Sequence, residues 1–245
     1  MCYNYDIKSK TALVPAWRAD VIHEVDLIED AAIAYGYDNL VPEIPKVATI
    51  GQEDEKEKIK SKIAEILIGL NMNEISTYHM IKDEEAKSFK LIEKEKIQLE
   101  DSKTEYKILR PNIIIPALRT LAENKDNEYP QRLFEIGTCF ELDEENKEET
   151  GIKEPEKLVI VLASNTSNFT EIKQIWDYLA RMLNKEYSLT TQKQENKYTI
   201  ETRTAEIKIN NKTIGQVGEI KQEILNILGM KVPIALLEID LEQFY

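Results

Sequence analysis

The run of residues 157–164 constrains the fold of this chain more than any other stretch. It reads KLVIVLAS and is almost entirely apolar. A run of this length suits a strand, and a strand that is apolar on both sides is buried on both faces of its sheet. The sequence therefore predicts a central strand with other elements packed above and below it.

The remaining patterns predict more strands and several helices. Runs rich in β-forming residues predict strands at 13–22, 74–81, 96–101, 132–142, 187–191, 197–203, 205–220 and 232–244. Apolar residues at helical spacing predict helices at 23–35, 56–70, 83–92, 111–127, 168–183 and 221–229. Asn210–Asn211 is expected to form a tight turn, and Gly36 to end the first helix. This order predicts an α+β fold, mostly antiparallel, with a few helices on one side of the sheet.

The charge and the cysteines limit the classes of function. The chain has 245 residues and a formal net charge of −13, so it has no sequence-wide attraction for phosphates. If nucleic acid is involved, a partner is expected to supply the positive charge. Cys2 and Cys139 lie far apart and predict free thiols in a reducing compartment. No apolar run is long enough to span a membrane, and residues 1–10 lack an apolar signal core, which predicts a cytoplasmic protein.

Catalytic motifs are absent from the sequence. It contains no G-x-G-x-x-G, no phosphate-binding loop and no G-x-S-x-G. With only His23 and His79, a histidine-centred metal site or triad is disfavoured. We interpret His79 as structural and His23 as a helix cap. Arg110 and Arg119 could hold an anion, but the favoured interpretation is that they balance nearby acids, namely Glu123, Asp126 and Glu128.

One acidic cluster does stand out. Asp26, Glu29 and Asp30 are spaced so that a helix places them on one side, and Asp20 lies just before that helix. Such like charges need a counter-charge. From spacing alone, the favoured interpretation is a solvated acidic face with Arg18 as a salt-bridge partner. The alternative is a site for a hard cation such as Mg²⁺, which takes oxygen ligands.

Four blocks of sequence resemble one known family. Residues 14–40, VPAWRADVIHEVDLIEDAAIAYGYDNL, resemble a signature of the beta subunit of phenylalanine–tRNA synthetase. LRPNIIIPALRTLAENKDN, followed by QRLFEIGTCFEL, is similar to a later part of that subunit, and so are NFTEIKQIWDYLARML and IGQVGEIKQEILNILGMKVPIALLEIDLEQF. The similarity covers nearly the whole chain and matches the C-terminal part of the archaeal or eukaryotic type.

The resemblance implies two domains. Residues 1–41 would form the C-terminal end of a winged-helix-like domain that carries the acidic cluster. Residues 42–245 would form a module that copies the class II synthetase catalytic fold, an antiparallel sheet with flanking helices, but is inactive. Active members hold ATP with two arginines, one in an FR.E pattern on a strand and one beside a helix. In agreement with an inactive module, residues 132–142 lack the FR.E pattern and residues 215–225 lack the second arginine. The family's editing domain and most upstream domains are not in this sequence, so we expect a fragment or truncated form without proofreading.

The resemblance also implies a function by assembly. The chain would be a non-catalytic beta subunit, or a fragment of one, that joins an alpha subunit in an (αβ)₂ heterotetramer. It would not associate with a membrane. The complex would attach phenylalanine to tRNA(Phe) with ATP, and this chain alone would be inactive. The family's magnesium ligands fall on Asp20, Asp26, Glu29 and Asp30, which implies Mg²⁺ as a cofactor at a site shared with the alpha subunit. The alternative is a stand-alone, non-enzymatic binding or scaffold module.

An assembling subunit is expected to expose apolar area to its partner. We expect the helix at 56–70 or the strand at 132–142 to contribute that surface.

Overall fold

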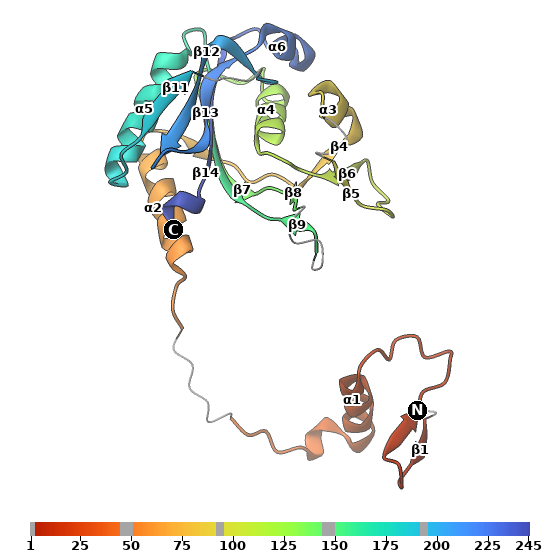
Figure 1. Cartoon of the computed structure of the whole chain (residues 1–245). Coiled ribbons are helices and arrows are strands. Elements are labelled where there is room, and N and C mark those ends of the chain that lie inside the picture. Colours follow the sequence, from red (N-terminus) through yellow and green to blue (C-terminus); the bar gives the residue numbers. More distant parts are fainter. Residues whose placement is uncertain (1–2, 45–50, 92–95, 144–149, 192–195) are drawn as a thin grey trace. The chain divides into compact units, whose positions relative to one another are not determined.

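The structure is a computed structural model that describes residues 3–44, 51–91, 96–143, 150–191 and 196–245. The chain divides into two compact units, Met1–Gln52 and Glu53–Tyr245, which are coloured red-orange and orange-to-blue in Figure 1. Each unit is described by itself.

A seven-stranded sheet forms the centre of the second unit (Figure 1). Its strands, in spatial order, are β11 (Ser188–Thr191), β12 (Thr199–Ile209), β13 (Lys212–Ile220), β14 (Ile234–Asp240), β10 (Glu156–Ala163), β7 (Gln131–Thr138) and β3 (Asn73–Glu74). Neighbouring strands are antiparallel except for β3, which runs parallel to β7. The predicted antiparallel α+β fold is therefore present with one parallel pair at its edge.

The apolar run forms β10, between β14 and β7. Val159 and Val161 enter one buried cluster, whereas Leu158 and Ile160 enter the other. Because side chains alternate along a strand, this division confirms the prediction that the strand is buried on both faces.

Helices cover both faces of the sheet. Helices α2 (Glu55–Gly69) and α5 (Phe169–Met182) contribute to the cluster that contains Leu158 and Trp176. Helices α3 (Asp83–Ser88), α4 (Ile114–Glu123) and α6 (Gln222–Leu228) contribute to the cluster that contains Val159. The prediction that helices lie on one side was wrong. The physical reason is that β10 is apolar on both faces, so helices must pack against both faces of the sheet.

Two smaller sheets complete the second unit. One contains β4 (Met80–Lys82), β6 (Tyr106–Leu109) and β5 (Ile97–Gln98), and the other pairs β8 (Glu141–Leu142) with β9 (Ile152–Lys153). The predicted strand at 74–81 was wrong as a continuous element, because β3 and β4 belong to different sheets. The predicted strand at 132–142 is likewise divided between β7 and β8.

The predicted turn and helix end in the second unit are confirmed. Asn210 and Asn211 join β12 to β13 with φ of 51° and 64°. Two consecutive positive φ angles are typical of a type I′ hairpin turn, and asparagine tolerates them. Gly229 ends α6 in the left-handed conformation with φ of 65°.

The first unit contains a hairpin and a helix. Strand β1 (Asn4–Asp6) pairs with β2 (Thr11–Leu13), and α1 (Glu24–Tyr35) is followed by the short 3-10 helix η1 (Tyr37–Asn39). The helix and its end at Gly36, with φ of 92°, are confirmed. The strand predicted at 13–22 was wrong, since β2 ends at Leu13 and residues 14–23 form turns and irregular structure. Membership of a winged-helix-like domain stays a prediction.

Exposed apolar side chains gather in the first unit. Helix α1 has no buried residue, and Ile22 is 90% exposed. Further exposed large side chains in this unit include Trp17, Val25, Ile28 and Ile33. The segments predicted to expose apolar area contribute one large side chain each, Ile68 and Leu142. Both segments therefore contribute to the exposed apolar area, although most of the exposed large apolar side chains lie in the first unit, and contact of either segment with a partner stays a prediction.

None of the helices in the described ranges combines the length and apolarity needed to cross a membrane.

Candidate functional site

The first turn of α1 uses one of the four predicted metal ligands as a cap. The Asp26 carboxylate accepts hydrogen bonds from the Ile22 and His23 backbone N–H groups, both at 2.8 Å. His23 is the N-cap residue, and its Nδ1 accepts from the Val25 N–H at 3.2 Å. The backbone bonds from His23 and Ile22 hold the pKa of Asp26 below its usual range. The cap role predicted for His23 is confirmed.

Arg18 joins two more of the predicted ligands. Its Nε donates to the two Asp20 carboxylate oxygens at 2.9 and 3.0 Å, and its Nη2 donates to Asp20 at 2.6 Å and to Asp30 at 2.9 Å. The bond from Arg18 holds the pKa of Asp20 below its usual range. The salt-bridge role predicted for Arg18 is confirmed for Asp20 and extends to Asp30.

Tyr3 completes this cluster, and no sequence pattern pointed to it. Its hydroxyl donates to the Asp30 carboxylate, and its ring centroid lies 5.3 Å from the Arg18 guanidinium carbon. The hydroxyl bond from Tyr3, followed by that from Arg18, holds the pKa of Asp30 low. Tyr3 and Asp30 are 27 residues apart, and no local pattern encodes a contact over that separation.

The four carboxylates do not form a metal cage in this fold. Asp20 and Asp30 face Arg18, Asp26 faces the backbone, and Glu29 is exposed on α1. In the part of the chain that the structure describes, no group of three or more His, Cys, Asp or Glu side chains is placed to hold a metal ion. The residues as arranged do not fit Mg²⁺, and magnesium binding stays a prediction.

Arg110, one of the two arginines considered for anion binding, is hydrogen-bonded to three other residues inside the second unit. Its Nη1 donates to Glu135 at 2.7 Å and to the Thr77 hydroxyl at 2.7 Å, and its Nε donates to the Thr138 carbonyl at 2.8 Å. The Arg110 and Glu135 side chains are 1% and 3% exposed. The pair also requires Gly137, because a Cβ there would lie 2.4 Å from Arg110 Nη2.

Three further arginines of the second unit are also bound to glutamates. The pairs are Arg119 with Glu85 at 2.8 Å, Arg132 with Glu171 at 2.5 Å and Arg203 with Glu219 at 2.6 Å. Arg110 and Arg119 thus balance acids, as favoured from the sequence, but their partners are not the predicted Glu123, Asp126 and Glu128. These guanidinium groups each have a carboxylate partner within the chain.

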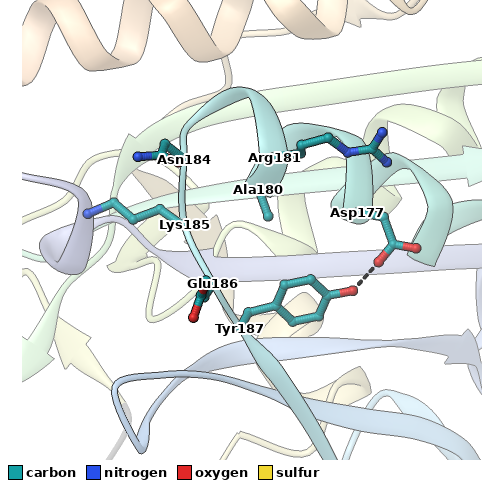
Figure 2. Close-up of a pocket in the computed structure, with 7 residues that line it drawn as sticks. All are labelled: Asp177, Ala180, Arg181, Asn184, Lys185, Glu186 and Tyr187. Atoms are coloured by element: carbon teal, nitrogen blue, oxygen red, sulfur yellow. Dashed lines mark hydrogen bonds between the residues drawn. The ribbon is translucent and has the colours of Figure 1, made fainter.

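The pocket in Figure 2 holds no catalytic arrangement. It has a volume of about 450 Å³ and lies where α5 ends and the chain turns toward β11. Its Asp177 accepts from the Tyr187 hydroxyl, as the dashed line shows, and from Lys173 at 2.8 and 2.9 Å. Lys185, on its rim, donates to the Gln243 carbonyl at 2.9 Å. The bond between Asp177 and Tyr187 connects α5 to the segment before β11, and the bond from Lys185 connects that segment to the C-terminal residues.

Cys139 is predicted to be inert in the folded protein. Its side chain is completely buried, and burial raises the pKa of its thiol, whereas only the exposed thiolate is nucleophilic. We expect iodoacetamide to modify Cys139 at neutral pH at least about a thousandfold more slowly in the native chain than in denaturant, because reaction requires unfolding. Peptide-resolved mass spectrometry measures this rate separately from that of Cys2. Rapid native modification would show that β7 ends in an open, accessible segment.

A comparison with solved structures shows a protein of similar fold. The chain is similar to the solved structure titled "Structure of Desulfitobacterium hafniense PylSc, a pyrrolysyl tRNA synthetase", with a TM-score of 0.62 and 15% identity. The match covers 78% of this chain and 65% of that one. The likeness is one of fold, and it is consistent with a class II aminoacyl-tRNA synthetase-like fold.

Sequence comparisons then identify the family. Residues 40–241 match the model of the phenylalanyl-tRNA synthetase beta chain CLM domain, and residues 3–37 match that of the tRNA synthetase B5 domain. The chain belongs to the family of phenylalanyl-tRNA synthetase beta chains. This result confirms the resemblance drawn from the sequence.

Curated relatives include phenylalanine–tRNA ligase beta subunits of archaea. The subunit of Pyrococcus abyssi is 33% identical over all of this chain and 44% of its own length. The subunit of Methanocaldococcus jannaschii is 34% identical over 94% of this chain and 41% of its own length. The chain therefore spans less than half the length of these relatives.

Proposed function

We propose that this chain is a non-catalytic beta-subunit module that assembles with an alpha subunit, and that the (αβ)₂ complex attaches phenylalanine to tRNA(Phe). Family membership over nearly the whole chain supports the beta-subunit role. The alpha subunit would carry out the ATP-dependent chemistry. The rest of the complex would supply most of the contacts to tRNA, because this chain has a net charge of −13. We place the complex in the cytoplasm.

The ion pairs between arginines and glutamates support the proposal that this chain is non-catalytic. Phosphoryl and adenylate chemistry needs positive groups aimed at the developing negative charge. Four of the five arginines in the second unit are bound to glutamates at 2.5–2.8 Å. The most deeply buried of them, Arg110, would leave the Glu135 charge uncompensated if it turned toward a nucleotide.

The two units correspond, in this proposal, to the two predicted domains. The first unit would be the end of a winged-helix-like domain, and the second would be the inactive synthetase-like module. The structural division falls at Gln52 and Glu53, and the two family matches meet between residues 37 and 40. The exposed apolar side chains around α1 support the proposal that another part of the assembled protein packs against the first unit.

Magnesium binding by Asp20, Asp26, Glu29 and Asp30 remains a prediction within this proposal. It would require Arg18 to release Asp20 and Asp30, which it holds at 2.6–3.0 Å. The Asp26 Oδ2 already accepts hydrogen bonds from two backbone N–H groups, which makes this oxygen less available to the ion.

The activity prediction is a comparison between the chain alone and the complex. The purified chain is expected to show no phenylalanine-dependent exchange of pyrophosphate into ATP, since four of the five arginines of its second unit are paired with glutamates. After co-expression with an alpha subunit of an archaeal relative, the same assay is expected to show exchange. Exchange by the chain alone would contradict the non-catalytic assignment. Failure to co-purify with any alpha subunit would favour the scaffold alternative.

A further inference from the structure

Arg18 occupies the position between Asp20 and Asp30 that a shared cation would take. Three of its hydrogen bonds reach Asp20 and one reaches Asp30, at distances from 2.6 to 3.0 Å. The Arg18 side chain is 17% exposed and that of Asp30 is 19% exposed. This is a close, partly buried contact with a fork-shaped cation that matches carboxylate geometry.

The surroundings of Arg18 hold it in this position. The Tyr3 ring centroid lies 5.3 Å from the guanidinium carbon, within range of a cation–π contact, and the Tyr3 hydroxyl donates to Asp30. Tyr3 thus contacts both partners of the ion pair. The contacts join the segment before β1 to the loop before α1 and to α1 itself.

A guanidinium and a divalent cation would compete for the oxygens of these two carboxylates. Mg²⁺ needs oxygen ligands at about 2.0–2.1 Å in near-octahedral geometry. Both Asp20 oxygens and the Asp30 Oδ2 accept hydrogen bonds from Arg18, and a divalent cation bound to these oxygens would lie close to the guanidinium and be repelled by it. Binding of one cation to these oxygens is therefore expected to weaken binding of the other.

We propose that Arg18 is the resident cation of this cluster and competes with divalent cations for Asp20 and Asp30. With Arg18 in place, the cluster is neutralised from within the chain and binds Mg²⁺ weakly. The inference starts from the carboxylates of the predicted magnesium site, gives them a different occupant, and does not depend on assembly with an alpha subunit.

Replacement of Arg18 tests the competition. Titration calorimetry with MgCl₂ is expected to show that Arg18→Met binds Mg²⁺ at least about tenfold more tightly than the wild-type chain, because a repelling charge is removed. Adding Asp20→Asn and Asp30→Asn to Arg18→Met is expected to abolish the gain. Arg203→Met removes the same charge from an exposed pair elsewhere and should leave magnesium affinity unchanged. Equal affinity of wild type and Arg18→Met, including no binding by either, overturns the proposal.

A second measurement uses the wild-type chain and does not depend on how a variant folds. In the ¹⁵N-labelled protein, the Arg18 Nε–H resonance reports its bond to Asp20. The proposal predicts that this resonance persists at millimolar MgCl₂ and shifts toward the position of a free arginine only as magnesium occupies the cluster. Saturable magnesium binding that depends on Asp20 and Asp30 but leaves the resonance unchanged would show that both cations coexist, and would overturn the competition.

Discussion

Replacing Arg110 by methionine is expected to lower the free energy of unfolding by about 3–5 kcal/mol. The reason is the Glu135 charge, because this side chain is 3% exposed and would remain buried without its partner. The Thr77 hydroxyl and the Thr138 carbonyl would lose hydrogen bonds in the same step. Because these contacts connect β7 with the segments before β4 and after β6, the loss should affect the whole second unit.

Arg203→Met provides a matched control for this prediction. Arg203 also binds a glutamate, Glu219, at 2.6 Å, but its side chain is 61% exposed. An exposed pair contributes about 0–1 kcal/mol. Urea unfolding followed by circular dichroism should therefore separate the two variants clearly. Similar losses in both, or less than about 1 kcal/mol for Arg110→Met, would show that the buried pair is not what holds these segments together.

Replacing Gly215 by alanine is the second change with a large expected effect. Gly215 lies in β13 opposite Ile239 of β14, and a Cβ there would lie 2.0 Å from the Glu238 carbonyl oxygen and 2.7 Å from the Ile239 Cα. Both are backbone atoms in the middle of the sheet and cannot move aside as a flexible side chain can. We expect a loss of about 1–3 kcal/mol, the usual cost of overpacking a core.

Gly69→Ala is the control with the opposite sign. Gly69 is the last residue of α2 and is exposed, and a Cβ there would meet nothing beyond its own helix within 4 Å. Alanine in a helix is favoured over glycine by about 0.5–1 kcal/mol, so this variant should be neutral or slightly stabilised. Thermal unfolding of the two variants beside wild type measures both effects. A Gly215→Ala chain as stable as Gly69→Ala would mean that β13 and β14 are not as closely paired as described.

The elements that could be predicted from the sequence are those whose signal is local. The apolar run of β10, the Asn210–Asn211 turn and the glycine after α6 each depend on a few neighbouring residues. The strand expected at 13–22 failed because β-forming side chains such as Val14 and Trp17 do not make a strand without a pairing partner. Pro15 also lacks the N–H that a ladder needs.

The candidate site shows the same division between local and distant contacts. The pairing of Arg18 with Asp20, two residues apart, could be predicted from spacing. The contacts of Asp30 with Arg18 and Tyr3 span 12 and 27 residues and depend on how the hairpin and α1 pack. Arg110 likewise found Glu135, which is distant in sequence, because burial selects the partner that the sheet brings within reach.

The proposed assembly of this chain with a catalytic alpha subunit is tested most directly by native mass spectrometry after co-expression. The chain and an archaeal alpha subunit are expected to co-purify and to give a mass corresponding to two copies of each. Two separate species, with this chain unaffected by a large excess of the alpha subunit, would contradict the account.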